Sequence, residues 1–451
     1  MFRLAWPLMA ELGLALLLGG VGTAWAARIS DAAGGGFALA MQVSAALFLL
    51  FRILGAGVGV VVTQALGAGE RATADRVTLA VLGASSWTGA ATAVLAVLFA
   101  WPLLRMLQAP PEVLALAAPF LQALAPALML DAWNATMASV MRAHLRTRDT
   151  LWVLLAMHAS HLALAWPLMQ GWGPVPALGL AGFAIALAIS RALGLVLHLW
   201  LWRRTLNLHP QRSDWWRLPR RELTAVLHIG VPGAAETVLH RLCFMVTLAA
   251  AAQLGATALA THAYVQQLQG GIWMFSLALG FTAEIMVGHH IGAGQFHAAQ
   301  SLVSRALLQG LGLTLAVSVA GALAAPALLG WFTQDSDILS MGQTLMWLTV
   351  LVETGRTFNL VLVNALRGAG DARYPLRAGW MSMPLVLAGG GWLLGITLGW
   401  GLPGLWLAYA ADEWLRGLLM WRRWATQAWV PQARQARRRL LTNNPSTQPM
   451  T

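Results

Sequence analysis

The chain has 451 residues, of which 58% are hydrophobic and only 10% are charged, and its formal net charge is +12 at pH 7. Soluble domains carry roughly 25% charged residues, so this composition excludes an ordinary soluble protein. The long Leu/Ala/Val runs do not alternate with polar residues, as the strands of a membrane β-barrel would. We therefore expect an all-α polytopic membrane protein.

Twelve apolar stretches are long enough to cross a bilayer core about 30 Å thick. We expect the membrane spans at 5–27, 36–66, 77–101, 115–141, 151–170, 178–202, 226–252, 259–291, 301–330, 338–366, 376–399 and 402–424. Six spans in each half would bring both halves into the membrane in the same orientation. The prediction is therefore two six-helix bundles related by a pseudo-twofold axis along the membrane normal.

These spans divide the chain into four parts. We expect a first six-helix lobe, a cytoplasmic inter-lobe linker rich in Arg and Trp, a second six-helix lobe, and a cytoplasmic tail. The tail is polar from about residue 430 and is expected to be disordered. The bounds of the four parts are 1–202, 203–222, 223–425 and 426–451.

The two halves repeat each other at a constant offset of 225 residues. The Gly-Ala-Gly sequence at 67–69 recurs at 292–294, where we expect a helix to end in left-handed backbone. Internal repeats of this kind are typical of transporters that alternate about a central site. Other identical pairs at this offset are Pro7 and Pro232, Glu11 and Glu236, Gln42 and Gln267, Asn134 and Asn359, Arg142 and Arg367, and Arg191 and Arg416.

The basic residues indicate the orientation in the membrane. All 29 are Arg, and among those in loops only Arg28 and Arg105 belong to loops of the minority parity. By the positive-inside rule, both termini are expected in the cytoplasm. The run Arg437-Arg438-Arg439 is interpreted as an anchor attracted to membrane lipid, and no nucleic-acid partner is expected. The single cysteine, Cys243, excludes an internal disulfide and a thiolate metal cluster.

Ionisable residues at membrane depth are the candidates for coupling, because each costs roughly 2.5–3.5 kcal/mol to insert. Glu11 and Glu236 each follow a proline by four residues. Because that proline removes a helix hydrogen bond, each glutamate is expected to face a polar cavity. Alternatively, both glutamates are solvated near a helix start. The candidates to take a proton or cation are Glu236, Glu284, Glu353, Glu11 and Asp131.

The spacing of Glu353, Arg356 and Asn359 predicts an ion pair on one helix face, with Asn359 turned toward a neighbouring helix. A pair that only fixes helix packing is the alternative. In the first half, Asp131 and Asn134 occupy the positions equivalent to Arg356 and Asn359, so the charge is inverted. The candidates to line a substrate cleft are His240, Arg356, Asn359, Asn134, Gln42, Gln267 and Trp273.

Arg191 and Arg416, in the last span of each half, are interpreted as snorkelling or hydrogen-bonding between helices. The chain shows no convergent nucleophile and base and no phosphate-binding loop, so an enzyme is not expected. No cofactor and no metal site are expected beyond H⁺ or Na⁺ as the coupling ion.

Three motifs of the second half lie in a characteristic order. They are Gly230-Val231-Pro232 opening a helix, Val287-Gly288-His289 running into the second Gly-Ala-Gly, and a loop from Leu366 to Pro375 that reads L-R-G-x-G-D-x-R-x-P. This order resembles the multidrug and toxic compound extrusion (MATE) family over nearly the whole chain. The resemblance implies two six-helix bundles that export bulky organic, often cationic, compounds in exchange for protons or sodium.

The chain departs from that family's pattern at three positions. Well-known bacterial members carry an aspartate in a V-D-T motif late in the first helix, where this chain has Val21-Gly22-Thr23. The seventh-helix glutamate of sodium-coupled members aligns with His240, and the tenth-helix aspartate aligns with Arg356. The coupling roles of those family residues therefore do not transfer directly to this chain.

The expected function is secondary-active export of a small organic, cationic or aromatic substrate from a bacterial inner membrane, by a monomer that alternates access between its lobes. One alternative is a flippase for lipid-linked precursors in the same superfamily, with Arg52, Arg241 and Arg356 in its cleft. Another is export of a flavin-type metabolite, because Glu353-Thr354-Gly355-Arg356 resembles a branch found in Gram-negative bacteria.

Overall fold

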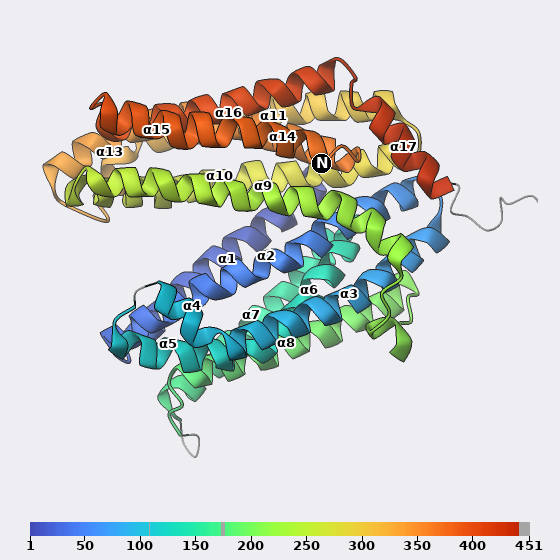
Figure 1. The fold of residues 1–451 in the computed structure, drawn as a ribbon, viewed down its shortest axis with the longest axis horizontal. Helices are drawn as coiled ribbons and strands as arrows, with labels where there is room; N and C mark the ends of the chain where they lie inside the picture. The colour runs from blue at the N-terminus through green and yellow to red at the C-terminus, as the bar shows by residue number, and fades with distance from the viewer. Residues whose placement is uncertain (108, 173–175, 442–451) are drawn as a thin grey trace, which may run out of the picture. The chain divides into compact units, whose positions relative to one another are not determined.

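The computed structural model describes residues 1–107, 109–172 and 176–441, and nearly all of them are helical (Figure 1). The α-helices of the first half are α1 (Phe2–Ala27), α2 (Asp31–Gly67), α3 (Arg71–Leu98), α4 (Ala100–Met106), α5 (Pro111–Ala123), α6 (Ala125–Ala143), α7 (Thr147–Gln170) and α8 (Leu180–Leu201). Those of the second half are α9 (Arg220–Gln253), α10 (Ala256–Gly292), α11 (Phe296–Leu323), α12 (Ala325–Leu329), α13 (Ser336–Gly368), α14 (Arg373–Ser382), α15 (Gly390–Trp392), α16 (Gly401–Ala425) and α17 (Val430–Leu441). The short elements η1 (Trp202–Leu206), η3 (Met383–Gly389) and η4 (Leu393–Thr397) are π-helical, and η2 (Arg212–Trp215) is a 3-10 helix.

The expected spans are helical, which confirms the all-α class. Among the described residues, ten helical segments are long and apolar enough to cross a membrane, and α5 with α6, bent by 48°, makes an eleventh. The twelfth expected span is α16, whose 25 residues include the buried charges Asp412, Glu413 and Arg416. Those charges lower its hydropathy, but they pair with one another inside the fold.

Helix ends recur at the offset found in the sequence. α2 and α10 end at Gly67 and Gly292, and Gly69 and Gly294, two residues further on, have φ angles of 77° and 75°. This left-handed backbone is the helix stop expected at the two Gly-Ala-Gly sequences. The third helix of each half is also interrupted at the same place, between α3 and α4 and between α11 and α12.

Three expectations need correction. The fourth span, 115–141, is two helices, because Pro126, the second residue of α6, lacks the N–H that would continue the hydrogen bonding of α5. The eleventh span is not a uniform α-helix, since η3 and η4 widen it. The expectation of a disordered tail from about 430 is wrong for Val430–Leu441, which form α17. The rest of the tail, 442–451, lies outside the described residues.

The chain divides into two compact units. One holds residues 10–62 and 71–230, and the other holds 1–9, 63–70 and the chain from Val231 onward. These bounds differ from the expected lobes of 1–202 and 223–425. The last turn of α2 belongs to the second unit because Gly67 packs closely on the backbone of His289 in α10. A Cβ at residue 67 would overlap the carbonyl oxygen of His289. The start of α9 joins the first unit because Gly230 packs equally closely on Ile53 of α2.

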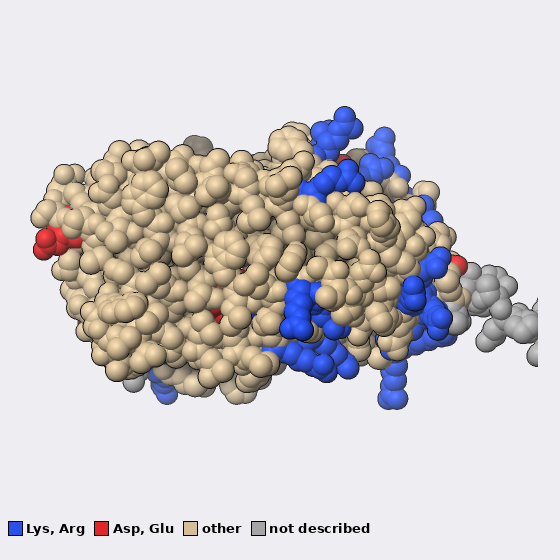
Figure 2. All heavy atoms as spheres, turned by 90° about the horizontal axis from the view of Figure 1, so that it is seen from above, with Lys and Arg blue, Asp and Glu red and all other residues tan. Residues whose placement is uncertain are grey.

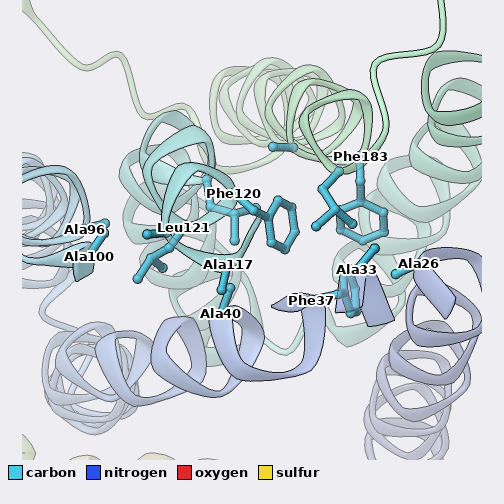
Figure 3. Close-up of a cluster of buried hydrophobic side chains, with 14 of the residues drawn as sticks. Ala26, Ala33, Phe37, Ala40, Ala96, Ala100, Ala117, Phe120, Leu121 and Phe183 are labelled. Atoms are coloured by element: carbon cyan, nitrogen blue, oxygen red, sulfur yellow. The ribbon is translucent and has the colours of Figure 1, made fainter. Parts of the chain in front are cut away.

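Each unit has its own apolar core. In the first unit, Phe37, Phe120 and Phe183 pack together among small residues of α2, α5 and α8 (Figure 3). In the second unit, one cluster surrounds Trp424 and Trp429, and another surrounds Trp406 and Tyr409.

The molecular surface suits a lipid environment. Figure 2 shows a face on which basic side chains gather toward one end, while most of the remaining surface is neither acidic nor basic. Large apolar side chains such as Leu308, Trp331 and Leu385 are exposed. Helices whose backbone groups are internally bonded can present such side chains directly to hydrocarbon.

Candidate functional site

The first element of the site is an ion pair that occurs once in each unit. Glu11 of α1 lies 3.2 Å from Arg142 of α6, and Thr150 of α7 donates a hydrogen bond to the same carboxylate. At the equivalent positions, Glu236 of α9 lies 2.7 Å from Arg367 of α13. Glu11 and Glu236 therefore tie the first helix of each repeat to its fourth span. Neither Arg142 nor Arg367 was expected from the sequence to be the partner of these glutamates.

A second charged position lies on the same helix face, eleven residues earlier in α6 and in α13. Eleven residues make three turns, so Asp131 lies on the face of Arg142, about 16 Å along the axis. Arg356 has the same relation to Arg367. Each unit thus has paired charged side chains at two positions along one helix, about three turns apart.

In the first unit, the charged residue at this second position of α6 forms a single ion pair. Asp131 lies 2.7 Å from Arg191 of α8. Asn134 donates from Nδ2 to the carbonyl oxygen of Arg191 at 2.9 Å, and its Oδ1 lies 3.1 Å from Nδ1 of His198. Arg191 therefore forms an inter-helix ion pair, so the snorkelling interpretation does not hold for it.

In the second unit, the equivalent position of α13 lies in a cluster of five charged side chains on α13 and α16. The expected pair is present, with Arg356 2.6 Å from Glu353, and Arg356 also lies 3.2 Å from Glu413. Arg416 lies 2.7 Å from Asp412 and 3.0 Å from Glu413. We call Glu353, Arg356, Asp412, Glu413 and Arg416 the acidic cluster.

Polar neighbours hold the acidic cluster in place. Asn359 donates to Glu413 at 2.8 Å, as its predicted turn toward a neighbouring helix requires. Ser382 of α14 donates to Asp412 at 2.6 Å, and Gln269 of α10 donates to Glu353 at 2.7 Å. His240 of α9 interacts electrostatically with Arg416, Glu413 and Arg356. Four helices besides α13 therefore contribute to one buried site.

The charges in this cluster do not cancel. Three carboxylates face two guanidinium groups, whereas Asp131 and Arg191 balance each other in the first unit. Glu353 is 0% exposed, and within the described part of the chain its Oε2 has no hydrogen-bond partner. A buried, unbalanced carboxylate is costly unless a cation or proton neutralises it. The cluster can therefore take up one positive charge.

The other candidate residues lie outside these contacts. Glu284 is 15 residues beyond Gln269 on α10, which is about 22 Å along the helix axis, so the structure does not bring it to Glu353. Gln42, Gln267 and Trp273 are exposed on α2 and α10. Their assignment to a substrate cleft stays a prediction. Gln269, two residues from Gln267, was missed, because its role depends on how α10 packs on α13.

The first unit leaves no room for a carboxylate at residue 22. A Cβ on Gly22 would lie 2.7 Å from Phe37 and 3.2 Å from Phe183. Phe37 and Phe183 belong to the aromatic core in Figure 3, with their ring centroids 4.9 Å apart. The space that an aspartate at residue 22 would need is thus filled by aromatic side chains.

Comparison with known proteins places the chain among transporters. The MatE family model matches residues 7–166 and 232–392. "Uncharacterized transporter YisQ" of Bacillus subtilis is 30% identical over 95% of this chain and 94% of its own length. "Probable multidrug resistance protein NorM" of Pseudomonas putida is 28% identical over 91% of this chain and 90% of its own.

Solved structures share the fold at low sequence identity. A mutant of the Vibrio cholerae MATE transporter VcmN superposes with a TM-score of 0.86 at 20% identity, covering 94% of this chain and 95% of that one. A MOP superfamily transporter from Pyrococcus furiosus gives 0.84 at 17% identity, covering 96% and 95%. These matches confirm the architecture of twelve spans in two six-helix bundles.

Proposed function

The chain belongs to the MatE family of bacterial membrane transporters, and on that premise we propose that it exports small organic molecules in exchange for protons. Relatives named as multidrug resistance proteins support an organic substrate, and the apolar helices support a place in the inner membrane. The arginines gathered in loops of one parity and in the tail support cytoplasmic termini.

The observation that carries the coupling proposal is the uncompensated carboxylate of the acidic cluster. Glu353 is the group that takes the proton, because it is fully buried and its Oε2 has no partner among the described residues. Protonation brings the cluster to neutrality and weakens the hold of Glu353 on Arg356. A ligand shifts a transporter between two states only by binding them unequally. Proton uptake at Glu353 supplies that difference if water reaches it in one state only.

A proton suits this cluster better than Na⁺. Arg356 lies 2.6 Å from the carboxylate of Glu353, and Arg416 lies close by on α16. A sodium ion bound at Glu353 would stand next to these guanidinium groups and be repelled. A proton neutralises the carboxylate without adding a separate cation. The two carboxylates that flank Arg356 also argue against the flippase alternative, which needs a cationic cleft.

The test is dye export from everted vesicles with ΔpH and the sodium gradient imposed separately. We expect ΔpH to drive ethidium transport by the wild type, and Glu353→Gln to lose gradient-driven transport. Thermal stability of Glu353→Gln should be equal or higher, because the buried cluster becomes neutral. Asp337→Asn, an exposed acid in the first turn of the same helix, is the control and should transport normally. Full transport by Glu353→Gln, or transport driven only by sodium, would contradict the proposal.

A further inference from the structure

Arg191 in the first unit is incompletely satisfied. Its Nε forms a close ion pair with Asp131, 2.7 Å from Oδ1. Its Nη1 is buried and has no hydrogen-bond partner among the described residues. The side chains of Arg191 and Asp131 are still 15% and 18% exposed, so the pair can be reached from outside the core. An arginine in this state has N–H groups available for another acceptor.

Two histidines of α7 lie within electrostatic reach of Arg191. His158 and His161, three residues apart, both interact electrostatically with it. The ring of His161 is fixed by a backbone hydrogen bond to Ala186 and by an edge contact with Phe183 at 4.6 Å between centroids. Nevertheless, His158 Nε2 and His161 Nδ1 are buried without a hydrogen-bond partner in the described chain. Buried polar atoms of native proteins are usually paired, so unpaired atoms on three interacting residues indicate a ligand or water.

The charges around these residues differ from those of the acidic cluster. Glu11 and Arg142 pair with each other, and Asp131 is matched by Arg191. His198 is engaged by Asn134. Among the described residues around Arg191, the carboxylates of Glu11 and Asp131 are each matched by a guanidinium, and the Nη1 of Arg191 has unmet bonding capacity. The planar guanidinium fork is the protein group best matched to a carboxylate.

We propose that Arg191, within electrostatic reach of His158 and His161, binds the carboxylate of those transported molecules that carry one. The inference rests on the proposed export function and adds a substrate feature to it. Asp131 competes for the same guanidinium and limits the affinity. This competition predicts opposite effects on carboxylate binding for substitutions of Arg191 and of Asp131. Removing Arg191 weakens binding of a carboxylate, whereas neutralising Asp131 strengthens it, and a purely structural ion pair would respond alike to both changes.

The experiment compares two dyes that share a chromophore, rhodamine B with its free carboxylate and rhodamine B ethyl ester. Binding to full-length protein in detergent micelles is measured by fluorescence polarisation, so no gradient is needed. Arg191→Gln should weaken the binding of rhodamine B by about tenfold, which is the contribution of a hydrogen bond to a charged group. The ester should be unaffected. Asp131→Asn should tighten the binding of rhodamine B and leave the binding of the ester unchanged.

Arg191→Lys provides a second variant if Arg191→Gln does not fold, and it should retain part of the preference for the carboxylate. Absence of rhodamine B binding to the wild type, or equal changes for the two dyes in the variants, would overturn the inference. Failure of the export proposal is a separate result, because it would leave this binding selectivity intact while vesicles show no gradient-driven transport.

Discussion

The close contact between the ends of α2 and α10 leads to a quantitative prediction for Gly292→Ala. A Cβ at residue 292 would overlap the carbonyl oxygen of Gln64 and lie 2.8 Å from the backbone nitrogen of Ala68. Both atoms are backbone, so no side-chain rotation relieves the overlap. Gln64 is also held from the other side, because its Nε2 donates to Gly368 at 2.8 Å. The end of α2 must therefore move as a whole.

The loss of stability expected for Gly292→Ala is the balance of two opposing contributions to the free energy of unfolding. Overpacking of a tightly packed site typically costs about 1–3 kcal/mol, and a rigid backbone contact belongs at the upper end. Alanine favours a helix over glycine by about 1 kcal/mol. The net loss for Gly292→Ala is therefore about 2 kcal/mol. Gly312→Ala in α11 is the matched control, because nothing lies within 4 Å of its Cβ and only the helix term applies.

The chain contains its own reporter for this measurement. Cys243 is the single cysteine, and it is 6% exposed in α9 of the same unit. A thiol-reactive fluorogenic dye will therefore label the purified protein only as that unit unfolds on heating. We expect Gly292→Ala to melt below the wild type and Gly312→Ala to melt at or above it. If Gly292→Ala melts as high as Gly312→Ala, the reasoning from backbone overlap is wrong.

Two further predictions concern the charged pair and the aromatic core. Arg367→Gln leaves Glu236 buried without its partner and should cost about 3–5 kcal/mol, whereas Glu236→Gln together with Arg367→Gln should recover most of that loss in the same melting assay. A double variant no more stable than Arg367→Gln would refute the pairing. Gly22→Asp should lower the melting temperature by driving a carboxylate into Phe37, and Phe37→Ala in the same chain should offset part of the loss by making room. Wild-type stability of Gly22→Asp would show that the core there is loose.

Much of the fold could be predicted from the sequence because local features set the helix boundaries. Apolar length marks the spans, and the two Gly-Ala-Gly sequences end α2 and α10 at equivalent places. Pro126 gives a local signal for the bend after α5 that the span prediction passed over. The helix at Val430–Leu441 was missed because its arginines look like a solvated tail, although Ala433 and Leu440 are buried.

The site was harder to predict because ion pairs depend on which helices pack together. Glu353 and Arg356 are close in sequence, so helix spacing alone predicted their contact. The third partner, Glu413, lies on another helix, and no periodicity connects the two. One available signal was overlooked. Glu11 and Arg142 recur together at the repeat offset as Glu236 and Arg367, and opposite charges that recur together indicate a pair.

The π-helical turns η3 and η4 give the eleventh span a freedom that an ordinary helix lacks. A π turn holds one residue more than an α turn, so its conversion slides the following chain by about 1.5 Å and rotates it by about 100°. Ser382, bound to Asp412, stands just before η3 and would not be displaced. Gly391 and Gly395, which pack against Leu405 of α16, lie within the stretch that would slip. The part of this span that follows Ser382 can thus change register while its anchor at the charged site stays fixed.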